Sequence, residues 1–302
     1  MDGDVRLNRP VIRKTFSMLL VFIALCFAVQ VSAAAGNHHL PHYLAENRSR
    51  YAAYQDRNPD MDFGVVVALV NANADLEPYS HIQTVASPAA VNVLTNKNFA
   101  LPAGYEPADL VTSDGGRMIR AEAAAHFDMM QAAAREDGHG LFIWSGYRSY
   151  STQVSSYNMA LAGGTSGGGT GGVEWADRRS ARPGHSEHQT GLTIDVSHRR
   201  DLAGGQNADG FALTPAYRWL TEHAHKYGFI LRYPQGLIHI HGYIYEPWHW
   251  RYVGESIATA MFVEGIATYE EYYGRYLAPA VRMKLRFSGH ADSVFINKHM
   301  PM

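Results

Sequence analysis

Histidine and carboxylate side chains gather in two short stretches of the sequence, where together they could carry out hydrolytic metal chemistry. The first stretch contains His185, His188 and Asp195, and the second places Glu246 three residues before His249. Two histidines and an aspartate can hold a zinc ion and leave its fourth position open for water. A separate glutamate can then take the proton of that water. These residues are therefore candidates for a hydrolytic metal site.

The spacing of these residues is also compatible with a purely structural role. Gly191 lies between His188 and Asp195, so the pair suits a loop followed by a strand and not one face of a helix, and no H-E-x-x-H motif occurs. A histidine and an aspartate this close also form hydrogen-bonded surface pairs. Glu246 has aromatic neighbours, and an unpaired carboxylate is costly to bury among them. It is therefore either hydrogen-bonded for structural reasons or held for chemistry.

The composition is that of a globular protein with an ample core. The chain has 302 residues, of which 46% are hydrophobic and 18% charged. The formal net charge of −2 provides no polybasic surface, so nucleic acid is not an expected partner. No internal repeat or clear linker divides the chain, which favours one catalytic domain.

The N-terminus has the features of an export signal. Four basic residues precede an almost continuously apolar segment, which ends in the small-residue sequence Val31-Ser32-Ala33. We expect residues 1–33 to be a signal peptide and the protein to be exported, whether periplasmic, in the cell envelope or secreted. An uncleaved membrane anchor is the alternative. Cys26, the only cysteine, lies in this segment, so a metal site in the mature chain must use His, Asp and Glu.

Hydrophobic patterning predicts short strands and separated helices, which favours the α+β class. Gly163–Gly172 is glycine-rich and is predicted to be a loop. Helices are predicted over residues 41–57 and 117–136, around Gln153, from Thr214-Pro215, beyond Gly254 and after Thr268. Strands are predicted over residues 63–70, 91–95, 141–145, 193–197, 229–232 and 238–245.

Three segments in order, SGYRSYSTQ, ARPGHSEHQTGLTIDVS and YEPWHWRYVG, closely resemble the VanY-type D-alanyl-D-alanine carboxypeptidases, which are zinc peptidases of peptidoglycan. The similarity runs from about Val91 to Tyr273. It implies a hedgehog/DD-peptidase-like fold, with a small antiparallel sheet flanked by helices. It also implies an N-terminal extension over residues 34–90, a catalytic domain over 91–276 and a tail over 277–302. Thr193 stands where the family often has alanine.

The resemblance assigns roles to residues of this chain. It makes His188, Asp195 and His249 the ligands of Zn²⁺. It makes Glu246 the general base, which then protonates the leaving amine. Arg148 would stabilise the oxyanion or hold a substrate carbonyl. Gln153 and Ser186 match positions near the substrate, and Ser186 is able to bind its terminal carboxylate. Three further histidines match no ligand position and are predicted to be structural: His185, His239 and His241.

The leading hypothesis is an exported zinc carboxypeptidase that removes the terminal D-alanine from peptidoglycan stem peptides. Within the enzyme class, the alternative is an LD-carboxypeptidase acting on the tetrapeptide, or an endopeptidase cutting cross-links. A different class is a zinc-containing module that binds wall peptide without catalysis. Glu246 and Arg148 argue against that module because mere binding does not require them. Membrane contact is expected only through an uncleaved N-terminal segment.

Overall fold

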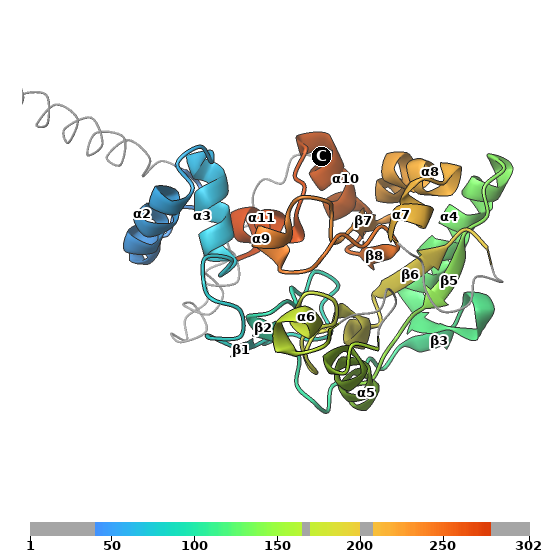
Figure 1. Cartoon of the computed structure of the whole chain (residues 1–302). Helices are drawn as coiled ribbons and strands as arrows, with labels where there is room; N and C mark the ends of the chain where they lie inside the picture. The colour runs from blue at the N-terminus through green and yellow to red at the C-terminus, as the bar shows by residue number, and fades with distance from the viewer. Residues whose placement is uncertain (1–39, 165–169, 200–207, 279–302) are drawn as a thin grey trace, which may run out of the picture.

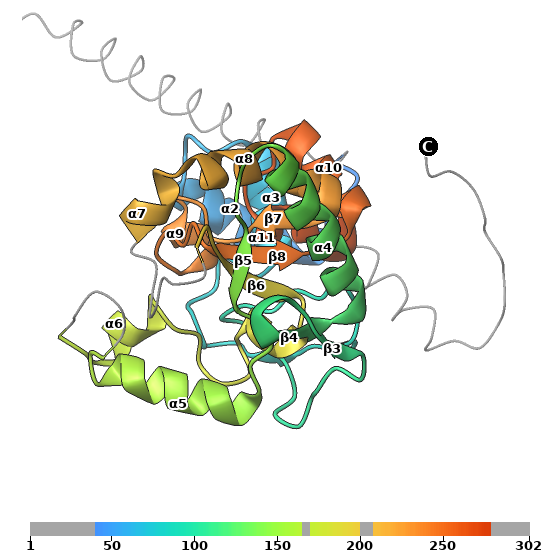
Figure 2. The same ribbon diagram turned by 90° about the vertical axis from the view of Figure 1, so that its right-hand side faces the viewer.

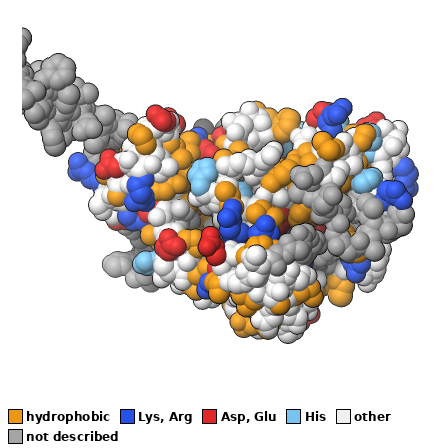
Figure 3. Space-filling view, viewed as in Figure 1, with side chains coloured by type: hydrophobic (Ala, Val, Ile, Leu, Met, Phe, Trp, Pro, Cys, Tyr) orange, Lys and Arg blue, Asp and Glu red, His pale blue; other side chains and the backbone are white. Residues whose placement is uncertain are grey.

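The computed structural model describes residues 40–164, 170–199 and 208–278. The predicted signal peptide, the middle of the glycine-rich loop and most of the predicted tail lie outside these ranges. Within them, no helix combines the length and the apolar character needed to cross a membrane. Figure 3 shows acidic and basic side chains interspersed on one face, in keeping with the small net charge.

The centre of the fold is a four-stranded antiparallel sheet with strand order β5-β6-β8-β7 (Figure 1). Its strands are β5 (Phe142–Ser145), β6 (Thr193–Ser197), β7 (Phe229–Leu231) and β8 (His249–Tyr252). Helices flank this sheet, so the α+β class with a small antiparallel sheet is confirmed. Its four strands are short, with three to five residues each, so packing against helices helps to hold the sheet together.

One face of the sheet forms the main apolar core. Side chains alternate along a strand, so Ile194 and Val196 of β6 point to the same face, as do Trp250 and Tyr252 of β8. All four are at most 2% exposed. Helices that supply the rest of this core are α4 (Ala121–Glu136), α7 (Ala208–Ala212), α8 (Pro215–His223) and η4 (Ala224–Tyr227). In Figure 2, α4 runs beside the sheet along its length.

The other face carries polar side chains from the same two strands. Asp195 is paired directly with His249, and Thr193 with Arg251, in the antiparallel register of β6 and β8. Directly opposite residues in such a pair have side chains close together on one face. The register thus brings two candidate metal ligands together from positions far apart in the sequence.

The remaining elements surround this sheet. Two small sheets are formed by β1 (Gln83–Thr84) with β2 (Phe99–Ala100), and by β3 (Leu110–Thr112) with β4 (Met118–Arg120). The other helices are α5 (Tyr150–Leu161), α6 (Val173–Asp177), α9 (Ile238–His241), α10 (Glu255–Glu264) and α11 (Tyr269–Tyr272). Single helical turns are η1 (Ala45–Asn47), η2 (Asp114–Gly116), η3 (Glu187–Thr190) and η5 (Tyr273–Leu277).

An N-terminal helical hairpin lies at one end of the molecule (Figure 1). It consists of α2 (Arg48–Arg57) and α3 (Phe63–Asn71), and α3 packs against η5. The strand predicted over residues 63–70 is therefore wrong. Asp62 caps α3 by accepting hydrogen bonds from the backbone N–H groups of Gly64 and Val65, at 2.8 and 3.2 Å. Because α3 is buried on nearly all sides, it needs no polar face, and its β-branched run resembles a strand.

Two other predicted strands are also wrong. Residues 91–95 form no regular element, and residues 238–245 contain the short helix α9, which ends at Gly242 with φ of 81°. Conversely, β8 is not among the predicted strands. The strands predicted over residues 141–145, 193–197 and 229–232 are confirmed to within one residue. The predicted cap of α8 is confirmed too, since Thr214 Oγ1 accepts from the N–H of Tyr217 at 3.1 Å.

Candidate metal centre and active site

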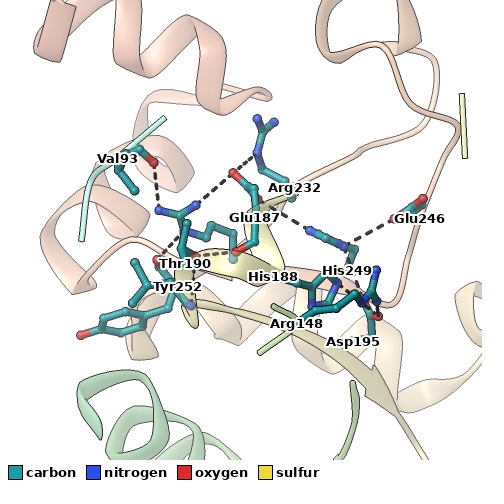
Figure 4. Close-up of polar contacts among 12 residues, drawn as sticks. Val93, Arg148, Glu187, His188, Thr190, Asp195, Arg232, Glu246, His249 and Tyr252 are labelled. Atoms are coloured by element: carbon teal, nitrogen blue, oxygen red, sulfur yellow. Dashed lines mark hydrogen bonds and ion pairs between the residues drawn. The ribbon is translucent and has the colours of Figure 1, made fainter. Parts of the chain in front are cut away.

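His188, Asp195 and His249 form a buried cluster on the polar face of the sheet (Figure 4). His188 Nε2 lies 3.4 Å from Asp195 Oδ2, and His249 Nδ1 lies 3.3 Å from Asp195 Oδ1. One donor atom from each residue falls within 4.8 Å of the others. The three residues assigned as ligands from the sequence are thus brought together.

These donors fit a zinc ion. With bonds of the usual length, two ligands of one tetrahedral zinc are about 3.3 Å apart. Each histidine nitrogen lies close to this distance from one oxygen of Asp195, His188 Nε2 from Oδ2 and His249 Nδ1 from Oδ1. Asp195 Oδ1 is buried without a hydrogen-bond partner in the described part of the chain. A cation bound between the three residues would satisfy that oxygen. Three protein ligands also leave one coordination position open, as catalytic zinc sites do.

The two histidines present different ring nitrogens to the cluster. His188 Nδ1 lies 2.7 Å from the carbonyl oxygen of Gly146. A carbonyl can only accept, so Nδ1 must carry the proton and Nε2 is left with a free lone pair toward Asp195. His249 is turned the other way and presents Nδ1.

The charges around the cluster favour a cation. Burial alone would raise the pKa of Asp195, but the charge that His188 and His249 carry when their rings are protonated holds it well below its ordinary range. Burial lowers the pKa of His188, which keeps that ring neutral. Burial would also lower the pKa of His249, but Asp195, Glu187 and Glu246 outweigh it and raise the value to about 9. The surroundings that attract a proton to His249 are equally suited to a metal ion.

Glu246 lies at the edge of the cluster, in the turn that precedes β8. Its Oε2 is 3.5 Å from His249 Nδ1, and the turn is closed by a bond from the His249 N–H to the Glu246 carbonyl oxygen at 3.1 Å. Burial raises the pKa of Glu246 to about 7. A carboxyl group with this pKa can both accept and release a proton near neutral pH, which is what a general acid–base requires.

Arg148 reaches the cluster from the loop after β5. Its Nη2 is 4.0 Å from Asp195 Oδ2 and 3.3 Å from Ser145 Oγ, and its Nη1 donates to Gln153 Oε1 at 2.9 Å. Gln153 in turn donates to the Ala181 carbonyl oxygen at 2.7 Å. The Gln153 amide is thus engaged on both sides by the protein, and in this geometry it holds Arg148 in place.

Ser186 lies at the start of η3, where its side chain makes no capping hydrogen bond. It lines a cavity of about 180 Å³ together with the triad, Glu246, Arg148 and Gln153. All seven site residues predicted from the sequence therefore surround one cavity. Six other residues of its lining were not singled out from the sequence, namely Arg179, Ser180, Ala181, Glu187, Tyr233 and Tyr243. A larger cavity of about 310 Å³ near β1 and η5 is lined by uncharged side chains and lies away from the triad.

The three histidines predicted to be structural take no part in the cluster. His185 Nδ1 is 2.8 Å from the carbonyl oxygen of Asn96, and its ring packs edge-on against Tyr79. His241 Nε2 is 3.3 Å from the carbonyl oxygen of Pro234, and His239 is exposed. These contacts agree with the structural role predicted for His185 and His241.

Glu187 is a residue of the site that sequence reasoning missed. It is 1% exposed, and its Oε2 lies 3.6 Å from His249 Nε2 (Figure 4). The only signal in the sequence was its place directly before His188. The arginines that neutralise it, Arg232 and Arg251, are far along the chain.

Comparison with known proteins gives concordant results. Residues 116–255 match the family model of VanY, D-alanyl-D-alanine carboxypeptidase. The chain is 38% identical over 208 residues to YodJ of Bacillus subtilis (strain 168), covering 66% of this chain and 72% of that protein. Among solved structures, the LdcB LD-carboxypeptidase aligns with a TM-score of 0.56 and 37% identity, covering 64% of this chain and 90% of LdcB.

A further solved structure, VanYB in complex with D-alanine-D-alanine, aligns with a TM-score of 0.51 and 33% identity, covering 60% of this chain and 96% of VanYB. The region that matches the family model, residues 116–255, contains the metal triad, Glu246 and Arg148. With this coverage and identity, and with the three motifs in order, the chain belongs to the VanY family of D-alanyl-D-alanine carboxypeptidases.

Proposed function

We propose that this protein is a zinc-dependent D-alanyl-D-alanine carboxypeptidase that hydrolyses the terminal D-alanine from peptidoglycan stem peptides. The observation that carries the proposal is the convergence of three metal donors, a buried carboxylate and an arginine on one cavity. When bound, zinc supplies a Lewis acid that activates water and polarises the scissile carbonyl. Similarity to a structure that contains D-alanine-D-alanine supports the choice of substrate.

In this reaction Glu246 moves the proton. Its Oε2 lies 3.5 Å from His249 Nδ1, the atom that would bind the metal, so the carboxylate is next to the candidate metal site. Glu246 takes the proton of that water, holds it at the carboxylate and delivers it to the leaving amine nitrogen. Its raised pKa of about 7 suits both transfers.

Arg148 provides fixed positive charge for the oxygen of the scissile carbonyl. A guanidinium is always charged and planar, so it can stabilise the negative charge that develops on this oxygen. The hydrogen bond from Nη1 to Gln153 sets its direction before substrate arrives. Donors that are already in place need no reorganisation during the reaction.

The test is mass spectrometry of a pentapeptide stem ending in D-Ala-D-Ala after incubation with the purified protein and zinc. We expect loss of one alanine, abolished by a chelator and restored by zinc. An unchanged pentapeptide in the presence of folded, zinc-loaded protein would exclude this activity.

LD-carboxypeptidase activity is the second candidate, favoured by the similarity to LdcB. The same assay on a tetrapeptide stem separates the two activities, and a cross-linked dimer tests for endopeptidase activity. If zinc binds stoichiometrically and no stem is cut, the protein is a binding module.

Export also belongs to the proposal, because peptidoglycan lies outside the cytoplasmic membrane. The basic N-terminus, the apolar segment and the small residues that follow it support this location. Fractionation of cells that express the full chain, with N-terminal sequencing of the product, tests it. Intact protein in the cytoplasmic fraction would exclude export.

A further inference from the structure

A row of buried charges lies behind the metal triad, with Glu187 at its centre. Glu187 Oε1 accepts hydrogen bonds from Arg232 Nε at 2.9 Å and Arg251 Nη1 at 3.0 Å. Arg232 also forms a bidentate ion pair with Glu270, in which Nη1 donates to Oε2 at 2.9 Å and Nη2 donates to Oε1 at 2.7 Å. All four side chains are at most 1% exposed. Buried charges are tolerated only when they are paired in this way.

Arg251 makes three further hydrogen bonds, all to backbone carbonyl oxygens. Its Nη2 donates to the carbonyl oxygens of Val91 and Val93, at 3.0 and 2.9 Å, and its Nε donates to the carbonyl of Tyr252 at 3.0 Å. Arg251 is therefore fixed to the backbone on two sides. Since Arg251 and Arg232 both hold the same oxygen of Glu187, the carboxylate has little freedom to rotate.

The second oxygen of Glu187 is directed at a metal ligand. Glu187 Oε2 lies 3.6 Å from His249 Nε2, and neither atom has another hydrogen-bond partner in the described part of the chain. One is an acceptor and the other a ring nitrogen able to donate, so a small approach would satisfy both. In Figure 4 the His249 ring lies between Glu187 on one side and Glu246 with Asp195 on the other.

We propose that Glu187 is a positioning residue, which fixes the tautomer and ring direction of His249 and thereby strengthens metal binding. A proton on Nε2 shared with Glu187 leaves the Nδ1 lone pair free, 3.3 Å from Asp195 Oδ1. His188 achieves the same result with the opposite nitrogen, because the Gly146 carbonyl holds its Nδ1 proton. The inference rests on the metal site of the proposed function and is independent of the substrate.

The competing role for Glu187 is only to neutralise Arg232 and Arg251. Glu270 offers a matched control, because it neutralises Arg232 from the other side. Among the described residues, the carboxylates within 4 Å of a His249 ring nitrogen are those of Glu187, Asp195 and Glu246, so Glu270 does not face that ring. Glu187→Gln and Glu270→Gln each remove one buried charge from the same row. Only the first also changes the group that faces His249.

Glu187→Gln has a specific expected effect. The arginines retain the acceptor oxygen of the new amide, so its NH₂ group turns toward His249 Nε2. A donor there favours the proton on Nδ1, the nitrogen needed by the metal. Loss of such outer partners of a metal ligand typically lowers metal affinity about 10- to 100-fold.

The experiment measures zinc dissociation constants for the full chain and both variants by competition with a chromogenic chelator, alongside thermal unfolding of the metal-free proteins. We expect Glu187→Gln to bind zinc about 10- to 100-fold more weakly and Glu270→Gln to bind it within about 3-fold of the unaltered protein. Equal affinity in all three proteins, or an equal loss in both variants, would overturn the proposal.

A second measurement needs no variant, and it tests the positioning role of Glu187 even if Glu187→Gln does not fold. Nitrogen-15 NMR of the histidines in the zinc-loaded, unaltered protein should show His249 bound through Nδ1 with a slowly exchanging Nε2 proton. Metal on Nε2, or a freely exchanging Nε2 proton, would overturn the proposal. If the unaltered protein binds no zinc, the proposed function itself fails, and that result is distinct from unchanged affinity in Glu187→Gln.

Discussion

The two faces of the central sheet are built from the same strands and differ in almost every physical property. On one face, Ile194 and Trp250 join a wholly apolar core. On the other, their immediate neighbours Asp195 and His249 form the candidate metal site. Stability and chemistry are thus separated by the alternation of side chains along β6 and β8. Substitutions of the candidate site residues on the polar side should lower activity with little effect on stability, and substitutions of core residues on the apolar side should do the reverse.

The largest effect is expected from Glu246→Gln. Because Glu246 moves the proton in the proposed reaction, this change should lower kcat on the stem peptide by about 10²- to 10⁴-fold. It also removes a buried charge while keeping the shape of the side chain, so the melting temperature should stay the same or rise. Steady-state kinetics and calorimetry check both parts. A variant with more than a tenth of the original kcat would refute the role of Glu246.

Arg148→Ala should have the next largest effect. Removal of one fixed donor to a developing oxyanion lowers kcat by about 10²- to 10³-fold. Zinc content should be unchanged, since Arg148 is not among the three donors. Arg117→Ala is the matched control, because Arg117 is exposed and lies over Trp144, outside the cavity. Equal kinetics for the two variants would exclude a role for Arg148 in the reaction.

On the apolar face, Ile194→Ala should lower the free energy of unfolding by about 2–5 kcal/mol, because it leaves a cavity in a closely packed core. Ile194 is fully buried and is the direct neighbour of Asp195. Activity per folded molecule should nevertheless be retained. Denaturant titration and active-site counting by bound zinc check this, with Val263→Ala, on an exposed side chain, as control. Loss of zinc affinity in folded Ile194→Ala would show that the two faces are not independent.

The smallest effect is expected at Thr193, the other neighbour of Ile194. Its hydroxyl is buried on the polar face without a hydrogen-bond partner among the described residues. Thr193→Val keeps the volume and removes this unsatisfied group, so it should raise the free energy of unfolding by about 1 kcal/mol. Zinc affinity should not change. A destabilised variant would mean that the hydroxyl has a partner such as ordered water.

The sequence was sufficient to predict the α+β class, the strand that carries Asp195 and seven of the residues that line the cavity. The first two predictions depend on local signals. Thr193–Ser197 alternates in the way a half-buried strand does, and Thr214-Pro215 has the residue types of a helix start. The resemblance to a family added the roles of residues far apart in the chain, which spacing alone left ambiguous.

The failures have tertiary causes. The run Phe63–Val70 has the residue types of a strand, but α3 is enclosed by α2 and η5, and burial on all sides removes the usual helical pattern. The strand β8 was missed because Arg251 is charged, although it lies fully buried in the sheet. The importance of Glu187 was hidden for a different reason. Its partners, Arg232 and Arg251, are distant in sequence, and no local pattern shows that their charges meet.

The register of β6 against β8 also has a consequence for folding. A shift of β6 by one residue against β8 would turn Ile194 toward the metal site and bury Asp195 in the apolar core, while His249 of β8 kept its place. Only the native pairing can then bind zinc, and a ligand present at about 100 times its dissociation constant stabilises the form that binds it by about 2.7 kcal/mol. Zinc present during folding would thus favour the native strand pairing over the shifted one. The yield of native protein should therefore depend on the zinc available to the newly made chain.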